Sequence, residues 1–144
     1  MRGASLTRRV QFHATHRYYK PEWDEARNRA VFGACASPEP HGHHYACEVT
    51  VRGPIDAVTG MVVDLGRLDE LLATHVVKPL DGMLINAALP EFAPGKQIPT
   101  CEELARVIAQ RLEVALGKSD PAVRVAAVRV AEDDTLSATW TAEG

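Results

Sequence analysis

The sequence lacks several features that mark common protein classes. Its formal net charge is only −3 over 144 residues, so the composition gives no reason to expect a nucleic-acid partner. No apolar run approaches the roughly 18 residues that a transmembrane helix needs, so we expect no membrane partner. The stretch Met1–Ser5 has no apolar core behind its positive charges, and we do not interpret it as a secretory signal.

Cysteine is also scarce. The three cysteines are widely spaced and do not have the pattern of a disulfide framework. We therefore predict a cytoplasmic protein with reduced thiols. The hydrophobic content of 46% is ordinary for a globular protein, and a chain of this length can bury a core without disulfides. We expect a single domain over residues 1–144.

Strand-like alternation occurs near both ends of the chain, and helical periodicity occurs between them. The predicted strands are residues 6–15, 41–52, 124–131 and 135–141, and the predicted helices are residues 65 to about 76 and 101–116. Thr100 and Glu103 form a capping box before the second helix, and Gly117 suits its end. A weaker helical pattern covers residues 24–31. Residues 78–99 contain four prolines and predict an irregular connection, and Asp133–Asp134 predicts a tight turn.

This order, β-β-α-α-β-β, predicts an α+β fold. Hairpin-type connections at both ends imply a four-stranded antiparallel sheet with both helices on one face. Such a sheet has open edges, so we expect it to pair with other subunits.

Histidines are concentrated in one short stretch. His41 and His43 are separated by one residue on a predicted strand, so their side chains point to the same side of the sheet. His16, at the end of the first predicted strand, can complete a set of three. Zinc enzymes commonly use three protein ligands and leave a fourth position open. The alternative is two surface histidines on a strand and one unrelated loop histidine.

Other reactive side chains surround this stretch in the sequence. Cys35, six residues before His41, lies in a loop rich in glycine and proline and is a candidate acid, base or nucleophile, or an inert loop cysteine. Glu132 ends an apolar strand and can anchor a guanidine-like edge with two hydrogen bonds. Glu102 has the same option, but it also fits a capping or solvated acid.

Together, these and further residues resemble one known family. They are Phe12–Arg17, Phe32–Cys35, His41–Tyr45, Gly60–Leu65, Leu80–Asp81, Leu84–Asn86, Pro99–Glu102 and Glu132. Their order and spacing resemble those of the 6-pyruvoyl-tetrahydropterin synthase / 6-carboxy-tetrahydropterin synthase family, from about Gln11 to Trp140. The resemblance implies the tunnelling fold (T-fold). In that fold three subunits close their sheets into a barrel, two trimers stack into a homohexamer, and the active sites lie between subunits.

The resemblance also implies a chemistry. It implies Zn²⁺ on His16, His41 and His43, and a carbon–oxygen lyase that acts on 7,8-dihydroneopterin triphosphate by eliminating triphosphate and rearranging the side chain. Cys35 matches the residue that moves the proton. Glu132 matches the acid that holds the pterin ring. Thr100 and Glu102 match the segment beside the pterin-binding pocket.

The sequence departs from the family pattern at the proton relay. Family members have a histidine after the aspartate that matches Asp81, and this chain has Gly82 instead. His13 and His44 also stand where the family usually has other residues, and either is a candidate substitute for the missing imidazole. Three hypotheses follow: a synthase slowed or specialised by Gly82, a relative with altered chemistry on another carbonyl-bearing substrate, and a non-catalytic pterin-binding protein.

Overall fold

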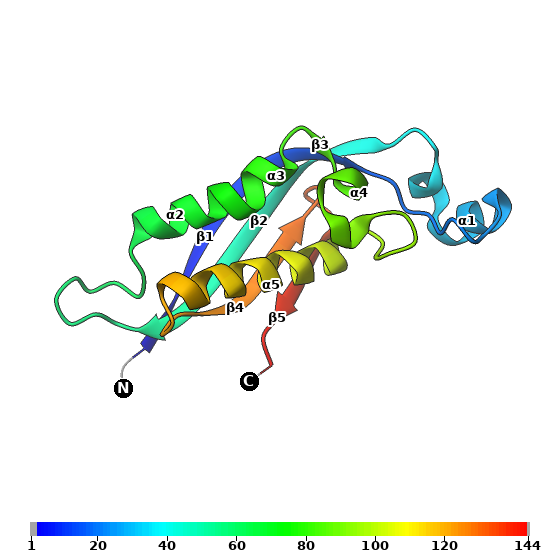
Figure 1. The fold of residues 1–144 in the computed structure, drawn as a ribbon. Coiled ribbons are helices and arrows are strands. Elements are labelled where there is room, and N and C mark those ends of the chain that lie inside the picture. The colour runs from blue at the N-terminus through cyan, green and yellow to red at the C-terminus, as the bar shows by residue number, and fades with distance from the viewer. Residues whose placement is uncertain (1–2, 144) are drawn as a thin grey trace.

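The computed structural model describes residues 3–143, which form an α+β fold around one mixed sheet (Figure 1). Residues 1, 2 and 144, which the expected domain includes, lie outside the described residues. The strands are β1 (Gly3–His16), β2 (His41–Pro54), β3 (Met83–Leu84), β4 (Arg124–Ala131) and β5 (Ser137–Thr141). The helices are α1 (Glu25–Phe32), α2 (Leu65–Leu72), α3 (Lys78–Leu80), α4 (Ile85–Ala88) and α5 (Cys101–Ser119). Within residues 3–143, no helix combines the length and the apolar character needed to cross a bilayer.

The sheet has five strands in the order β3-β1-β2-β4-β5. Four of them are the predicted strands, and they pair antiparallel. The prediction of a four-stranded sheet is wrong in one respect, because β3 adds a short parallel strand through Ala14↔Met83 and Thr15↔Leu84. Two residues are too few to show alternation, so only the tertiary pairing reveals this strand.

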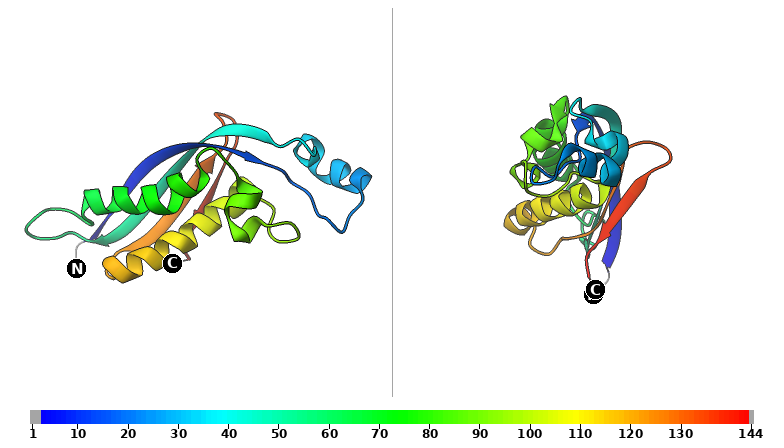
Figure 2. Two further views of the ribbon diagram at one scale, coloured as in Figure 1. Left: turned by 45° about the horizontal axis from the view of Figure 1, so that its top comes forward. Right: turned by 90° about the vertical axis from the view of Figure 1, so that its right-hand side faces the viewer.

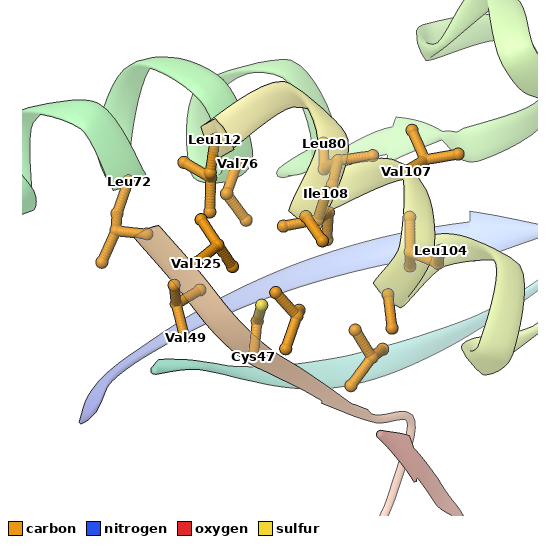
Figure 3. Close-up of a cluster of buried hydrophobic side chains, with 14 of the residues drawn as sticks. Cys47, Val49, Leu72, Val76, Leu80, Leu104, Val107, Ile108, Leu112 and Val125 are labelled. Carbon is orange, nitrogen blue, oxygen red and sulfur yellow. The ribbon is translucent and has the colours of Figure 1, made fainter. Parts of the chain in front are cut away.

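Helices cover one face of the sheet, as predicted (Figure 2). Val49 on β2 and Val125 on β4 meet Leu72 from α2 and Ile108 and Leu112 from α5 in the core (Figure 3). Each of these side chains is almost fully buried. This packing holds helices α2 and α5 against strands β2 and β4.

Several predicted boundaries are wrong. The helix expected to stop near residue 76 continues from α2 through a π-helical turn at Ala73–Val77 into α3. Helix α5 runs through Gly117 to Ser119, and the backbone N–H of Asp120 donates to the carbonyl of Leu116 at 2.7 Å. Glycine needs a left-handed backbone to end a helix in the expected way, and Gly117 does not adopt one.

Two predicted connections also have more structure than expected. The stretch 78–99 contains β3, α4 and a 3₁₀ turn at Pro90–Phe92. The predicted two-residue turn at Asp133–Asp134 is a longer loop, in which Glu132 N–H donates to the carbonyl of Leu136 at 3.1 Å. The Asp133 carboxylate organises this loop by accepting hydrogen bonds from the backbone N–H groups of Thr135 and Leu136.

A separate lobe follows β1. Helix α1 lies beyond the end of the sheet (Figure 1), and Asp24 caps it by accepting from the backbone N–H of Arg27 at 2.7 Å. A 3₁₀ turn at Gly33–Ala36 then leads to β2. This turn contains Cys35 and returns it to the sheet end where β1 stops and β2 starts.

The start of α5 gives a stability prediction. The Thr100 hydroxyl accepts from the backbone N–H of Glu103 at 3.1 Å, so Thr100→Ala removes a helix cap and should lower the free energy of unfolding by about 1 kcal/mol. Urea denaturation measures this change. Thr100→Ser keeps the hydroxyl and should retain most of the stability; equal losses in both variants would contradict a capping role.

Candidate metal centre and active site

Three imidazoles converge where β1 ends and β2 begins. The strand register places His16 directly opposite His41, and the two-residue period of β2 brings His43 to the same face. The ring centroids of His41 and His43 lie 5.0 Å apart, and that of His16 lies 4.6 Å from the first and 4.9 Å from the second. One nitrogen from each ring lies within 4.8 Å of the others. The structure thus brings together the three histidines that the sequence singles out.

His16 and His43 have features that suit metal ligands. Burial, followed by the neighbouring His41 and His43, lowers the pKa of His16 to about 3, so the ring is neutral at physiological pH. Nε2 of His43 is buried and has no hydrogen-bond partner. A buried nitrogen without a partner is costly, and a metal ion would satisfy it. The residues present thus fit a zinc ion with three nitrogen ligands.

Tyr45 orients the first of these ligands. Its hydroxyl lies 2.6 Å from Nδ1 of His16, while Nε2 of His16 faces Nε2 of His41 at 3.0 Å. When Nε2 binds a metal, the neutral ring carries its proton on Nδ1 and donates it to the Tyr45 oxygen. Histidine ligands are usually oriented by such a partner. Sequence analysis missed this role, although Tyr45 follows His41 and His43 on the same face of β2.

Cys35 lies at the His41 side of the cluster. Its sulfur is 3.6 Å from Nε2 of His41, and its side chain is partly exposed. Burial, followed by the Glu132 carboxylate, raises the pKa of the Cys35 thiol. Without a metal, the group is therefore a neutral thiol at pH 7.

Glu132 lies at the opposite side, next to His43. Its Oε2 is 3.1 Å from Nε2 of His43, but not in hydrogen-bonding geometry. Its Oε1 accepts from the Cys101 thiol at 3.5 Å, a contact that the sequence does not indicate because the two residues are 31 positions apart. A cavity of about 550 Å³ opens nearby on the His44 face of the sheet, and its lining includes Glu132 together with His44, Arg9 and Arg129.

The two predicted residues of the adjoining segment differ in availability. The Thr100 hydroxyl is occupied as the cap of α5. Glu102 lies exposed in the first turn of α5. Both flank Cys101, so they are close in sequence to the group that contacts Glu132.

Asp81 does not join this cluster within the chain. Its carboxylate accepts from the backbone N–H of His13 at 2.9 Å, three residues before His16. Among residues 3–143, no hydrogen bond links Asp81 to Cys35. Gly82 has φ +75°, and a Cβ there would meet no other atom within 4 Å. The position that would carry the relay imidazole is thus open space.

His13 and His44 lie on the other face of the sheet. They are opposite each other in the β1–β2 register, with ring centroids 6.4 Å apart. Nε2 of His44 pairs with the Gln11 side chain. Their strand parity separates them from the three imidazoles, so within one chain neither contacts Cys35.

Comparisons with known proteins agree on one family. The profile described as 6-pyruvoyl tetrahydropterin synthase matches residues 5–143. The chain is 40% identical over 117 residues to 6-pyruvoyl tetrahydrobiopterin synthase of Drosophila melanogaster, a match that covers 81% of this chain and 68% of that protein. The Homo sapiens protein of the same name is 36% identical over 113 residues, with coverage of 78% and 77%. The Caenorhabditis elegans 6-pyruvoyl tetrahydropterin synthase structure has a TM-score of 0.89 at 26% identity, with coverage of 99% and 98%.

Removing the Tyr45 hydroxyl should weaken metal binding. Tyr45→Phe keeps the ring stacked on Phe12, at a centroid distance of 5.2 Å, but leaves Nδ1 of His16 without its partner. We expect zinc affinity to fall by about 10- to 100-fold, as measured by competition with a chromogenic chelator. Tyr18→Phe is the matched control, because the Tyr18 ring also packs on His16; an equal loss there would contradict the specific role of Tyr45.

Proposed function

Because the chain belongs to the 6-pyruvoyl tetrahydropterin synthase family of lyases, we propose that it acts on 7,8-dihydroneopterin triphosphate. The proposed reaction eliminates triphosphate and rearranges the side chain of the pterin. One observation carries the proposal: three imidazoles converge with a thiol on one side and a buried carboxylate on the other.

The proposed metal is a zinc ion held by His16, His41 and His43. When bound, zinc supplies a Lewis acid that polarises side-chain oxygens of the substrate and makes the adjacent C–H bond more acidic. The sheet holds these ligands rigidly, because His41 and His43 lie on β2 and His16 on β1 lies directly opposite His41. Tyr45 holds the ring of His16 in the orientation that this role needs.

Glu132 is the proposed anchor of the pterin ring. The ring edge of a pterin offers adjacent N–H donors, and a carboxylate can accept two of them side by side. Only about a tenth of the Glu132 side chain is exposed, so water competes weakly for its oxygens. In this proposal Thr100 and Glu102 support the same pocket from the start of α5.

Cys35 is the proposed carrier of the proton. It lies beside one metal ligand, and a thiolate there can remove a proton from an acidified carbon. Asp81 is retained as the proposed acidic member of the relay, but the relay is interrupted because Gly82 has no imidazole to link it to Cys35. Loss of a general acid–base group costs roughly 10²- to 10⁴-fold in rate, so we expect slow turnover of this substrate.

We also propose that the protein works in the cytoplasm as a homohexamer, a dimer of trimers with active sites between subunits. Two open strand edges support assembly. Strand β1 pairs with β3 only at Ala14 and Thr15, and within the described residues β5 pairs with β4 alone. Unpaired edges favour pairing with another chain.

The open space at Gly82 favours a second candidate function, altered chemistry on another carbonyl-bearing substrate in the same pocket. A non-catalytic pterin-binding role is the third possibility. It predicts that pterin binds without any release of triphosphate.

Metal analysis tests the proposed site directly. The purified protein should contain about one zinc per chain, as expected for a three-histidine site, and His43→Ala should lose most of it. His44→Ala is the matched control, since it removes the neighbouring imidazole on the other face of β2. A metal-free wild-type protein would contradict the proposed site, and so would equal metal loss in both variants.

Triphosphate release from 7,8-dihydroneopterin triphosphate tests the reaction. Cys35→Ala should reduce the wild-type rate by about 10²- to 10⁴-fold, the usual value of a general base. Gly82→His restores an imidazole and should raise the rate. Gly82→Asn is its control, because asparagine meets the same left-handed backbone, which costs most residues about 1–2 kcal/mol, without adding an imidazole.

The outcomes separate the candidate functions. Release by Gly82→His but not by wild type favours altered chemistry in the native protein. Binding of the substrate with no release by either protein favours the non-catalytic role. An unchanged rate in Cys35→Ala would contradict the assignment of the base.

A further inference from the structure

Cys35 lies next to one of the three imidazoles, but its sulfur is not among the ligand atoms that lie within 4.8 Å of one another, so ligation requires its side chain to rotate toward the cluster. Its sulfur lies 3.6 Å from Nε2 of His41, and that nitrogen lies 3.0 Å from Nε2 of His16. In a tetrahedral zinc site with Zn–N bonds of about 2.0 Å and a Zn–S bond of about 2.3 Å, nitrogen and sulfur ligands lie about 3.5 Å apart. We propose that Cys35 is the fourth metal ligand in the substrate-free protein, so that the base is stored on the metal. This inference rests on the proposed zinc site.

The backbone around Cys35 is tied to the metal cluster. The Cys35 carbonyl accepts from the backbone N–H of Tyr18 at 2.8 Å, and the Ala36 carbonyl accepts from Nε of Arg17 at 3.1 Å. Both donors come from the two residues that follow His16. The 3₁₀ turn therefore keeps a constant position relative to a metal ligand, and rotation of one side chain directs the sulfur.

Charge and ligand preference favour the sulfur. Three neutral imidazoles leave both positive charges of the metal uncompensated, and a thiolate offsets one of them. Glu132 is the competing donor, because its Oε2 lies 3.1 Å from Nε2 of His43. Its other oxygen already accepts from Cys101, and zinc binds thiolates strongly as a borderline-soft ion.

Ligation also explains how this thiol can become a base. The S–H bond breaks, its proton passes to the buffer, and the sulfur lone pair forms the bond to the metal. Metal binding would therefore generate a thiolate and release about one proton per site.

Cobalt provides the test, because Co²⁺ replaces zinc and a thiolate–cobalt bond gives an intense charge-transfer absorption in the near ultraviolet. The full-length protein is stripped with a chelator and loaded with Co²⁺ without any pterin. We expect the wild type to show this band and Cys35→Ala to lose it while still binding cobalt. Cys101→Ala is the matched control and should keep the band, since Cys101 contacts Glu132 and no imidazole among the described residues.

Each of the other outcomes contradicts a different part of the proposal. Bound cobalt without the band in the wild type means that Cys35 is not a ligand, while the three-histidine site stands. A band that persists in Cys35→Ala and disappears in Cys101→Ala means that Cys101, and not Cys35, is the sulfur ligand. Failure of the wild type to bind cobalt or zinc overturns the metal site itself. Calorimetry in buffers of different ionisation enthalpy gives a second readout: the wild type should release about one more proton per metal than Cys35→Ala.

Discussion

The antiparallel pairing of β1 with β2 is the constraint on which the rest of the site depends. Its register runs from Gly3↔Pro54 to His16↔His41 without interruption. A shift by one residue would turn His41 and His43 to the opposite face and separate them from His16. The apolar side chains further along both strands prevent that shift, because it would also expose the core. The same hydrophobic burial that stabilises the sheet therefore determines the geometry of the candidate metal centre.

The cluster combines groups that are individually costly to bury. His16 is fully buried and neutral, His43 has an unpartnered nitrogen, and Glu132 is a nearly buried carboxylate. The hydrogen bonds available to them are few: Tyr45 for the first and a weak thiol donor, Cys101, for the last. These buried polar groups lower the stability of this end of the sheet, and the apolar layer between the sheet and α5 offsets that loss. Such an arrangement is typical of a functional site, where local rules of burial are broken.

The proton-relay region shows the opposite situation. Asp81 and Gly82 are not strained toward the cluster, since both make hydrogen bonds to the backbone of His13. These contacts attach the end of α3 to β1 and allow β3 to pair alongside. In a single chain, Asp81 thus has a structural role that is independent of catalysis.

The sequence by itself determined the elements with strong periodicity: the four long strands, the two main helices and the shared face of His41 and His43. Alternation and capping are local properties, so they can be read without coordinates. Tertiary structure alone decided the features that depend on distant partners, namely the pairing of β3 and the contacts of His16 with Tyr45 and of Glu132 with Cys101. Each of these joins segments whose proximity no local pattern encodes, because it results from packing the helices on the sheet and pairing the strands in one register.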